Sequence, residues 1–264
     1  MAWILEILQY AEEQDKRVQI RLTSPQYVTP SRGPDFLGYF FEPVEPEVPL
    51  KPALWHRVGD INDLKLPRHY DGSLQIETAR DMLFRHYRFR AEVLAEFDVF
   101  ARDLLGTMPA LGVHFRGTDK TGEADRVSPL RMLRAIELEL AHMPAGSRLF
   151  VATDEQAFLD ACLQRFGRRV MALPDHRRST DDRPVHKDLA ADGYSLGRDA
   201  LFNCLMLSRC RRVLKTASIL SAWAKVFEPA LEIYTLSRRR GMHSKYFPER
   251  CIPDYLPPHL ATVA

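Results

Sequence analysis

Residues 148–174 read RLFVATDEQAFLDACLQRFGRRVMALP. The run RLFVATD is short and apolar, as in a buried strand, whereas EQAFLDACLQRF carries apolar residues at helical spacing. RVMALP is again a short apolar run. A strand, a helix and a second strand in direct succession predict a βαβ unit, whose two strands lie parallel in one sheet.

The same alternation continues on both sides of this stretch. ALGVHF (110–115) predicts a strand, and a helix is expected to begin at Ser128 with Pro129 as its first turn residue. Downstream we expect, in order, a helix over 199–210, a strand over 211–216, a helix over 218–227 and a strand over 230–236. This order predicts a parallel sheet with helices on both faces, which binds ligands at the carboxyl ends of its strands.

The N-terminal third follows a different pattern. Residues 3–14 predict an amphipathic helix, and the alternating RVQIRLTS (17–24) predicts a half-buried strand. A proline-rich irregular stretch follows, and residues 76–105 predict one long helix or two abutting helices. We therefore expect a reduced N-terminal domain over residues 1–106, and a C-terminal domain over 107–264 whose tail packs back on it.

Composition excludes several classes of protein. The chain has 264 residues, of which 45% are hydrophobic and 27% charged, which fits one large or two small soluble domains. A net charge of +2 argues against nucleic-acid binding through bulk charge. There is no apolar run of about 18 residues and no basic start, so we expect neither a transmembrane segment nor a secretory signal, and a cytoplasmic location. Four cysteines without a CxxC pair indicate reduced, buried thiols.

The densest polar cluster is GVHFRGTDKTGEAD (112–125), directly after the strand over 110–115. Arg116 and Lys120 suit a diphosphate, because a guanidinium binds it through a planar fork and an ammonium as a point charge. Glu123 could act as a base beside them. A charged surface turn would give the same residues, but six polar groups at the carboxyl end of a strand favour a binding site.

Two other strand ends carry polar groups. TAS (216–218) opens a predicted helix, where backbone N–H groups and the helix dipole favour phosphate. Asp154 ends the strand over 148–154 at the same expected edge of the sheet. The pair Asp181-Asp182 lies in a polar loop, and no DxD sequence stands where a magnesium site would be expected. We predict neither a metal site nor a bound cofactor.

Three segments together resemble the fucosyltransferase superfamily that includes the nodulation and α1,6-fucosyltransferases. GVHFRGTDK is similar to the family's HxRxTDK segment, and LFVATDE to its strand ending in ATD. ALFNCLMLSRCRRVLKTASILSAWA is similar to its helix–strand–helix unit with a Ser-rich turn. The resemblance covers residues 110–235 well and the N-terminal third loosely.

This resemblance implies an α/β fold of GT-B type, in which two Rossmann-like domains face each other and the C-terminal one holds GDP-fucose. In this reading Arg116 contacts the diphosphate, His114 lies near the nucleotide, and Glu123 is the base. The other positions carried over from the family are the Asp119–Lys120 pair, the phosphate-binding Thr216 and Ser218, and the base-recognising position, here Asn203.

The sequence departs from the family in three places. Gly117 stands where the family has a second arginine, which removes one cation. Asn203 replaces an aspartate that accepts two hydrogen bonds from guanine, whereas an amide accepts through one oxygen; Asp199, one turn earlier, could substitute. The chain also opens inside its first helix, without the family's preceding strand and glycine-rich turn.

These observations predict an inverting, metal-independent glycosyltransferase that moves fucose from GDP-fucose to a glycan or lipo-oligosaccharide acceptor. The alternative is a catalytically weak or inactive relative that binds a nucleotide or a glycan. A remoter alternative, nucleic-acid binding through the basic run SRRRGMHSK (237–245), fits poorly with the near-neutral net charge.

Overall fold

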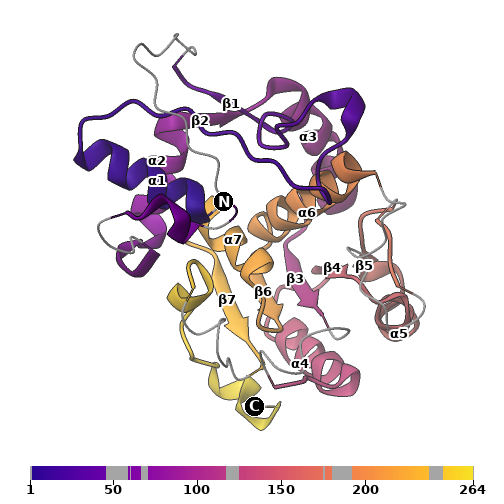
Figure 1. Ribbon diagram of the computed structural model, residues 1–264. Helices are drawn as coiled ribbons and strands as arrows, with labels where there is room; N and C mark the ends of the chain where they lie inside the picture. Colours follow the sequence, from indigo (N-terminus) through magenta and orange to yellow (C-terminus); the bar gives the residue numbers. More distant parts are fainter. Residues whose placement is uncertain are drawn as a thin grey trace.

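A computed structural model describes residues 2–45, 59, 61–66, 71–116, 125–174, 176–179, 192–237 and 246–263. Its centre is a five-stranded parallel sheet (Figure 1). The strands are β3 (Ala110–Phe115), β4 (Arg148–Thr153), β5 (Val170–Met171), β6 (Arg212–Lys215) and β7 (Glu232–Thr235). Their order across the sheet is β5-β4-β3-β6-β7, which confirms the predicted parallel sheet.

Helices cover both faces of this sheet (Figure 1). They are α4 (Pro129–Ala141) and α5 (Gln156–Phe166) on one face, and α6 (Gly193–Ser208) and α7 (Ile219–Phe227) on the other. Alternate residues of β3 serve the two faces, because successive side chains of a strand point in opposite directions. Leu111, Val113 and Phe115 join the hydrophobic core of α4 and α5. Ala110 belongs to the second core, on the α6 side.

Gly112 allows α6 to lie close to β3. A Cβ atom at this position would stand 2.9 Å from Leu207 and 3.0 Å from Val213, closer than side-chain atoms can pack. Leu207 is on α6 and Val213 is on the neighbouring strand β6. Glycine therefore lets the helix and the sheet pack closely here without displacing these side chains.

Local sequence signals set the starts of two helices. The Ser128 hydroxyl accepts a hydrogen bond from the Arg131 N–H at 3.2 Å, and Pro129 is the first residue of α4, as predicted. Helix α6 begins at Gly193, six residues earlier than predicted. The reason is the cap at Asp192, whose carboxylate accepts from the Ser195 N–H at 3.1 Å.

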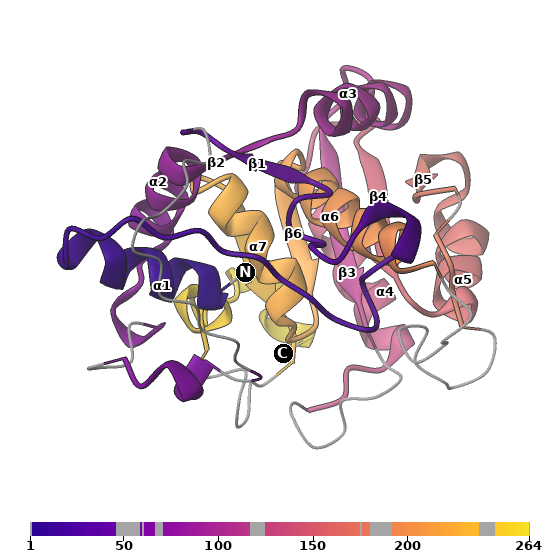
Figure 2. The same cartoon turned by 45° about the horizontal axis from the view of Figure 1, so that its top comes forward.

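The N-terminal part consists of α1 (Ala2–Glu13), α2 (Ile76–His86), α3 (Ala91–Leu105) and the antiparallel pair β1 (Phe41–Pro43) and β2 (Tyr87–Phe89). It lies over the helices α6 and α7 (Figure 2). Arg80 of α2 donates to the carbonyl of Phe227 at 3.3 Å, and the Phe97 ring of α3 meets Phe202 of α6 at 5.6 Å. One hydrophobic core therefore runs from the N-terminal part into the α6 and α7 side of the sheet.

One N-terminal prediction is wrong, and another is narrowed to one of its alternatives. No strand forms over residues 17–24; there the Leu22 N–H donates to the Asp35 carboxylate at 2.9 Å, and the Leu22 carbonyl accepts from Phe36. Alternation alone cannot make a strand where no second strand pairs with it. Over residues 76–105 the two-helix alternative is confirmed; the short strand β2 separates the helices, because Phe89 pairs with Phe41 of β1.

Short 3-10 turns complete the described chain: Pro30–Arg32, Ile61–Leu64, Asp71–Ser73, Gly167–Arg169, Glu249–Cys251 and Pro258–Val263. The tail contacts the sheet and its helices. The Phe247 ring meets Trp223 of α7 edge-on at 5.9 Å, and Glu249 forms an ion pair with Lys215 at the end of β6. Within the described residues, no helix has the length and apolar character needed to cross a membrane.

Candidate functional site

The strand order places the candidate site at the carboxyl ends of β3 and β6. These strands are neighbours, yet the chain leaves β3 toward β4 on one side and leaves β6 toward β7 on the other. The crossover helices therefore diverge to opposite faces, and sheets of this kind bind ligands at such a point; we call the place between the two strand ends the β3/β6 crevice. Residues 114–116 and 215–218 lie at this point.

Arg116 and Thr216 meet across the crevice. The backbone N–H of Arg116 donates to the Thr216 hydroxyl at 3.1 Å, and the Thr216 N–H donates to the carbonyl of His114 at 3.0 Å. On the other side, Arg116 Nε lies 3.8 Å from the Asp154 carboxylate at the end of β4, and both side chains are 20% exposed. The guanidinium is thus held at the sheet edge while part of it remains open to a ligand.

Ser218 begins α7 in a geometry suited to an anion. It is the N-cap residue of this nine-residue helix and is 1% exposed, and its hydroxyl has no hydrogen-bond partner within the described residues. A buried hydroxyl without a partner costs free energy unless a ligand or water satisfies it. The N–H groups and positive dipole of a helix's first turn favour an anion, so a phosphate at the start of α7 could satisfy this hydroxyl.

His114 is buried at 7% exposure and pairs in register with Lys215 of β6 and Ala152 of β4. By strand alternation its side chain points to the same face as Gly112, that of α6 and α7. This places the imidazole beneath the crevice, on the side where α7 begins.

Asn203 and Asp199 lie one turn apart on α6, and both are buried. Cys204, the residue after Asn203, donates a hydrogen bond from its thiol to the carbonyl of Leu220 at 3.0 Å. The middle of α6 therefore lies against the first turn of α7. Burial raises the pKa of the Cys204 thiol to about 12, so that it stays protonated.

Asp199 belongs to a charged group with the segment after β5. Its carboxylate contacts His176 Nδ1 at 3.2 Å and Arg198 at 3.3 Å. Nearby, burial lowers the pKa of Arg178, while the attraction of Asp199 opposes this shift. The substitute carboxylate considered from the sequence is thus already engaged with the His176 imidazole and the Arg198 guanidinium.

The described residues contain no group of three or more His, Cys, Asp or Glu side chains arranged to hold a metal ion. The cysteines are all free thiols; Cys162, Cys204 and Cys210 are buried, and Cys251 is half-buried. This agrees with the prediction of reduced thiols.

Comparison with solved structures identifies the architecture. A NodZ α-1,6-fucosyltransferase, in a crystal soaked with GDP-fucose, is similar with a TM-score of 0.61 and 18% sequence identity, over 86% of this chain and 88% of that one. The chain has a fucosyltransferase-like fold. A second structure, fucosyltransferase NodZ from Bradyrhizobium, matches over the same shares with a TM-score of 0.54 and 18% identity. No family model matches this chain, and no curated protein matches it in sequence.

The similarity confirms the predicted α/β fold of GT-B-like type. Within this fold, five predicted site residues lie together at the sheet edge: His114, Arg116, Asp154, Thr216 and Ser218. Asn203 lies on the part of α6 that contacts the first turn of α7. Three further predicted site residues lie outside the described residues: Asp119, Lys120 and Glu123.

Sequence reasoning missed two supports of the candidate site. Ser237, after β7, accepts the Ala217 N–H at 2.7 Å and so fixes the turn before Ser218. Lys215, directly before Thr216, is fully buried and paired with Glu249. Ser237 could have been predicted, because it directly follows the strand expected over 230–236. The sequence around Glu249 carries no signal that connects it with Lys215, 34 residues earlier.

Proposed function

We propose that the protein is an inverting, metal-independent glycosyltransferase that transfers fucose from GDP-fucose to a hydroxyl of a glycan or lipo-oligosaccharide. One observation carries the proposal: Arg116, Thr216 and Ser218, whose hydroxyl has no partner among the described residues, lie together at the β3/β6 crevice of a fucosyltransferase-like fold. An arginine and a helix N-terminus together favour a diphosphate there.

The reaction proposed forms a bond between the acceptor oxygen and the anomeric carbon, while the bond from that carbon to the diphosphate oxygen breaks. The electron pair of the broken bond goes to GDP, whose charge increases in the transition state. Arg116 and the first turn of α7 then stabilise this charge without a metal ion. Attack from the face opposite the diphosphate inverts the anomeric centre.

The acceptor hydroxyl must lose a proton as it attacks. Glu123 is our proposed base, and Lys120 the second cation on the leaving group; both assignments rest on the family resemblance. A carboxylate in this role contributes roughly 10²–10⁴-fold to the rate. Glu123→Gln is therefore expected to lower turnover strongly and to leave GDP affinity nearly unchanged.

The first test is calorimetric titration with GDP, using UDP and ADP for comparison. We expect Arg116→Ala to weaken GDP binding by about two orders of magnitude, because it removes charged hydrogen bonds. Thr216→Val, which removes the oxygen that accepts the Arg116 N–H, should cost about tenfold. Arg134→Ala is the matched control, since Arg134 is an exposed arginine of α4 paired only locally with Glu137.

Turnover is tested by GDP release from GDP-fucose in the presence of candidate glycans, with and without EDTA, and the product anomer is assigned by NMR. Activity lost in EDTA, or retention of configuration, would refute the corresponding part of the proposal. Preference for UDP or ADP would discard GDP-fucose as the donor.

The second candidate is a relative that binds a nucleotide or glycan without turnover. Asn203 in place of an aspartate and the engagement of Asp199 with His176 favour it, because both weaken guanine recognition. Tight GDP binding with neither hydrolysis nor transfer would distinguish this candidate from the enzyme.

A further inference from the structure

An exposed basic patch lies at the C-terminal end of α5. This helix ends at Phe166, and the short turn Gly167–Arg169 leads from it into β5. Five exposed residues form what we call the α5 patch: Leu163, Gln164, Arg165, Arg168 and Arg169. Because β5 is an edge strand, the α5 patch lies at the opposite end of the sheet from β7 and the tail (Figure 1).

The described carboxylates near the α5 patch do not neutralise its charge. Glu137 of α4 contacts Arg165 at 2.6 Å and a second arginine, of α4, at 3.2 Å, so one carboxylate serves two cations. The hydrogen bond from Arg165 lowers the pKa of Glu137 most. Asp160 is the one acidic residue of α5 and lies more than a turn before Arg165. Within the part of the chain that the structure describes, Arg168 and Arg169 form no ion pair.

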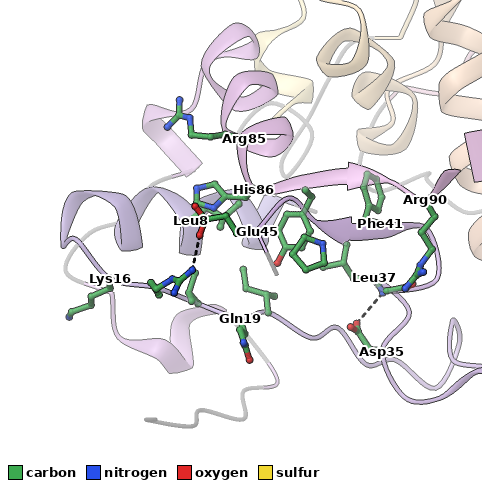
Figure 3. A pocket seen from close by; sticks show the side chains of 16 residues that line it. Leu8, Lys16, Gln19, Asp35, Leu37, Phe41, Glu45, Arg85, His86 and Arg90 are labelled. Atoms are coloured by element: carbon green, nitrogen blue, oxygen red, sulfur yellow. Dashed lines mark hydrogen bonds and ion pairs between the residues drawn. The ribbon is translucent and has the colours of Figure 1, made fainter. Parts of the chain in front are cut away.

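Several exposed arginines elsewhere do pair with carboxylates. A cavity of about 360 Å³ lies between α1 and the β1–β2 pair, and two arginines line it (Figure 3). Arg17 contacts Glu45 at 2.7 Å. Arg85 contacts Glu12 at 2.7 Å. The arginines of the turn after α5 differ from these two, because their charge is available to a partner.

The side chains of the α5 patch fit a phospholipid surface. A guanidinium binds phosphate oxygens through paired N–H donors, and each arginine near an anionic membrane contributes about fivefold to binding. Leu163, in the last turn of α5, is 45% exposed and adds an apolar group that lipid can bury. Single-stranded nucleic acids instead stack on aromatic side chains. The large exposed aromatic residues that the structure describes belong to other segments: Trp3, Tyr246 and Tyr255.

We propose that the α5 patch docks the protein on an anionic phospholipid membrane, with Arg168 and Arg169 on lipid phosphates and Leu163 at the acyl boundary. The α5 patch lies near the amino ends of the strands, whereas the β3/β6 crevice lies at their carboxyl ends. The eleven residues of α5 span about 16 Å between these two edges, so docking leaves the crevice open. This proposal does not rest on the proposed transferase function.

The test is co-sedimentation of the full chain with vesicles of phosphatidylcholine, alone or mixed with phosphatidylglycerol. We expect binding to the mixed vesicles only, weakening as salt is raised. The double variant Arg168→Ala, Arg169→Ala should bind about 25-fold more weakly, because it loses two arginines at about fivefold each. The double variant Arg85→Ala, Arg88→Ala is the matched control: it changes the net charge equally at exposed arginines outside the α5 patch, and should change vesicle affinity less than about twofold.

Leu163→Gln distinguishes a membrane from other polyanions. It leaves every charge in place, so retention on heparin should not change, while affinity for mixed vesicles should fall about fivefold. Unchanged vesicle affinity in this variant, equal losses in the two double variants, or no binding of the wild type to mixed vesicles would each overturn the proposal. Circular dichroism checks that each variant is folded. GDP titration, which these changes should not alter, tests the proposed function separately.

Discussion

The buried ion pair between Lys215 and Glu249 gives a sharp test of the fold. Both side chains are 0% exposed, and Nζ of the lysine contacts Oε2 of the glutamate. Lys215 ends β6, directly before Thr216, and lies on the same face of the strand as Val213. Glu249 opens a turn of the tail beside Phe247, which packs on Trp223 of α7. The pair thus ties the tail to the strand that carries the candidate phosphate turn.

Removal of either partner leaves the other charge buried. Glu249→Leu or Lys215→Met is therefore expected to lower the free energy of unfolding by about 3–5 kcal/mol. This is a large part of the roughly 5–15 kcal/mol by which such a domain is stable. At about 2–4 °C per kcal/mol, Tm should fall by roughly 10 °C.

The double variant should regain most of this loss, because two apolar side chains of similar volume suit the same site. Chemical denaturation of the wild type, the two single variants and the double variant gives the coupling energy, expected at about 3 kcal/mol or more. Arg134→Ala, which breaks an exposed pair with Glu137 on α4, should cost less than about 1 kcal/mol. A double variant as unstable as the sum of the single variants would refute the reasoning, and so would a cost below about 1 kcal/mol for Glu249→Leu.

Two further predictions concern titratable groups. Cys251 is half-buried and should be the one thiol that reacts with a disulfide reagent at pH 8 in the native protein, because burial raises the pKa of Cys162 to about 12 and the other two thiols are also buried. All four thiols should react in denaturant, and fast labelling of Cys162 in the native protein would contradict this prediction. Hydrogen bonds from Thr29 and Ser195 lower the pKa of Asp192 in the folded state. The charge of Asp192 therefore stabilises the folded protein at pH values above its unfolded pKa of about 4. This stabilisation is lost as the pH falls through the lower pKa of the folded state. Asp192→Asn should accordingly cost about 0.5 kcal/mol at pH 7 and progressively less as the pH falls below about 4, as measured by urea unfolding. A cost that does not change with pH would assign the effect to hydrogen bonding alone.

Local patterns determined much of the C-terminal part. ALGVHF contains only buried side chains and forms β3 with the predicted bounds, and Ser128 with Pro129 starts α4 as predicted. Such features depend on residues a few positions apart, whose periodicity and capping are visible in one sequence. The same patterns placed Arg116 and Thr216 at the carboxyl ends of two parallel strands. Such ends lie at the same edge of a sheet, so the two residues were expected to lie there together.

Tertiary structure decided what local pattern could not. Residues 17–24 alternate like a strand but have no strand to pair with, so Asp35 takes the Leu22 N–H instead. Strand order alone brings Thr216 to Arg116, 100 residues earlier in the chain. Glu249 reaches Lys215 only because the tail folds over α7, and the burial of its carboxylate is offset by this ion pair. Which residues lie close in space, and which side chains lose contact with water, depends on the assembled fold. No single segment of the sequence determines either.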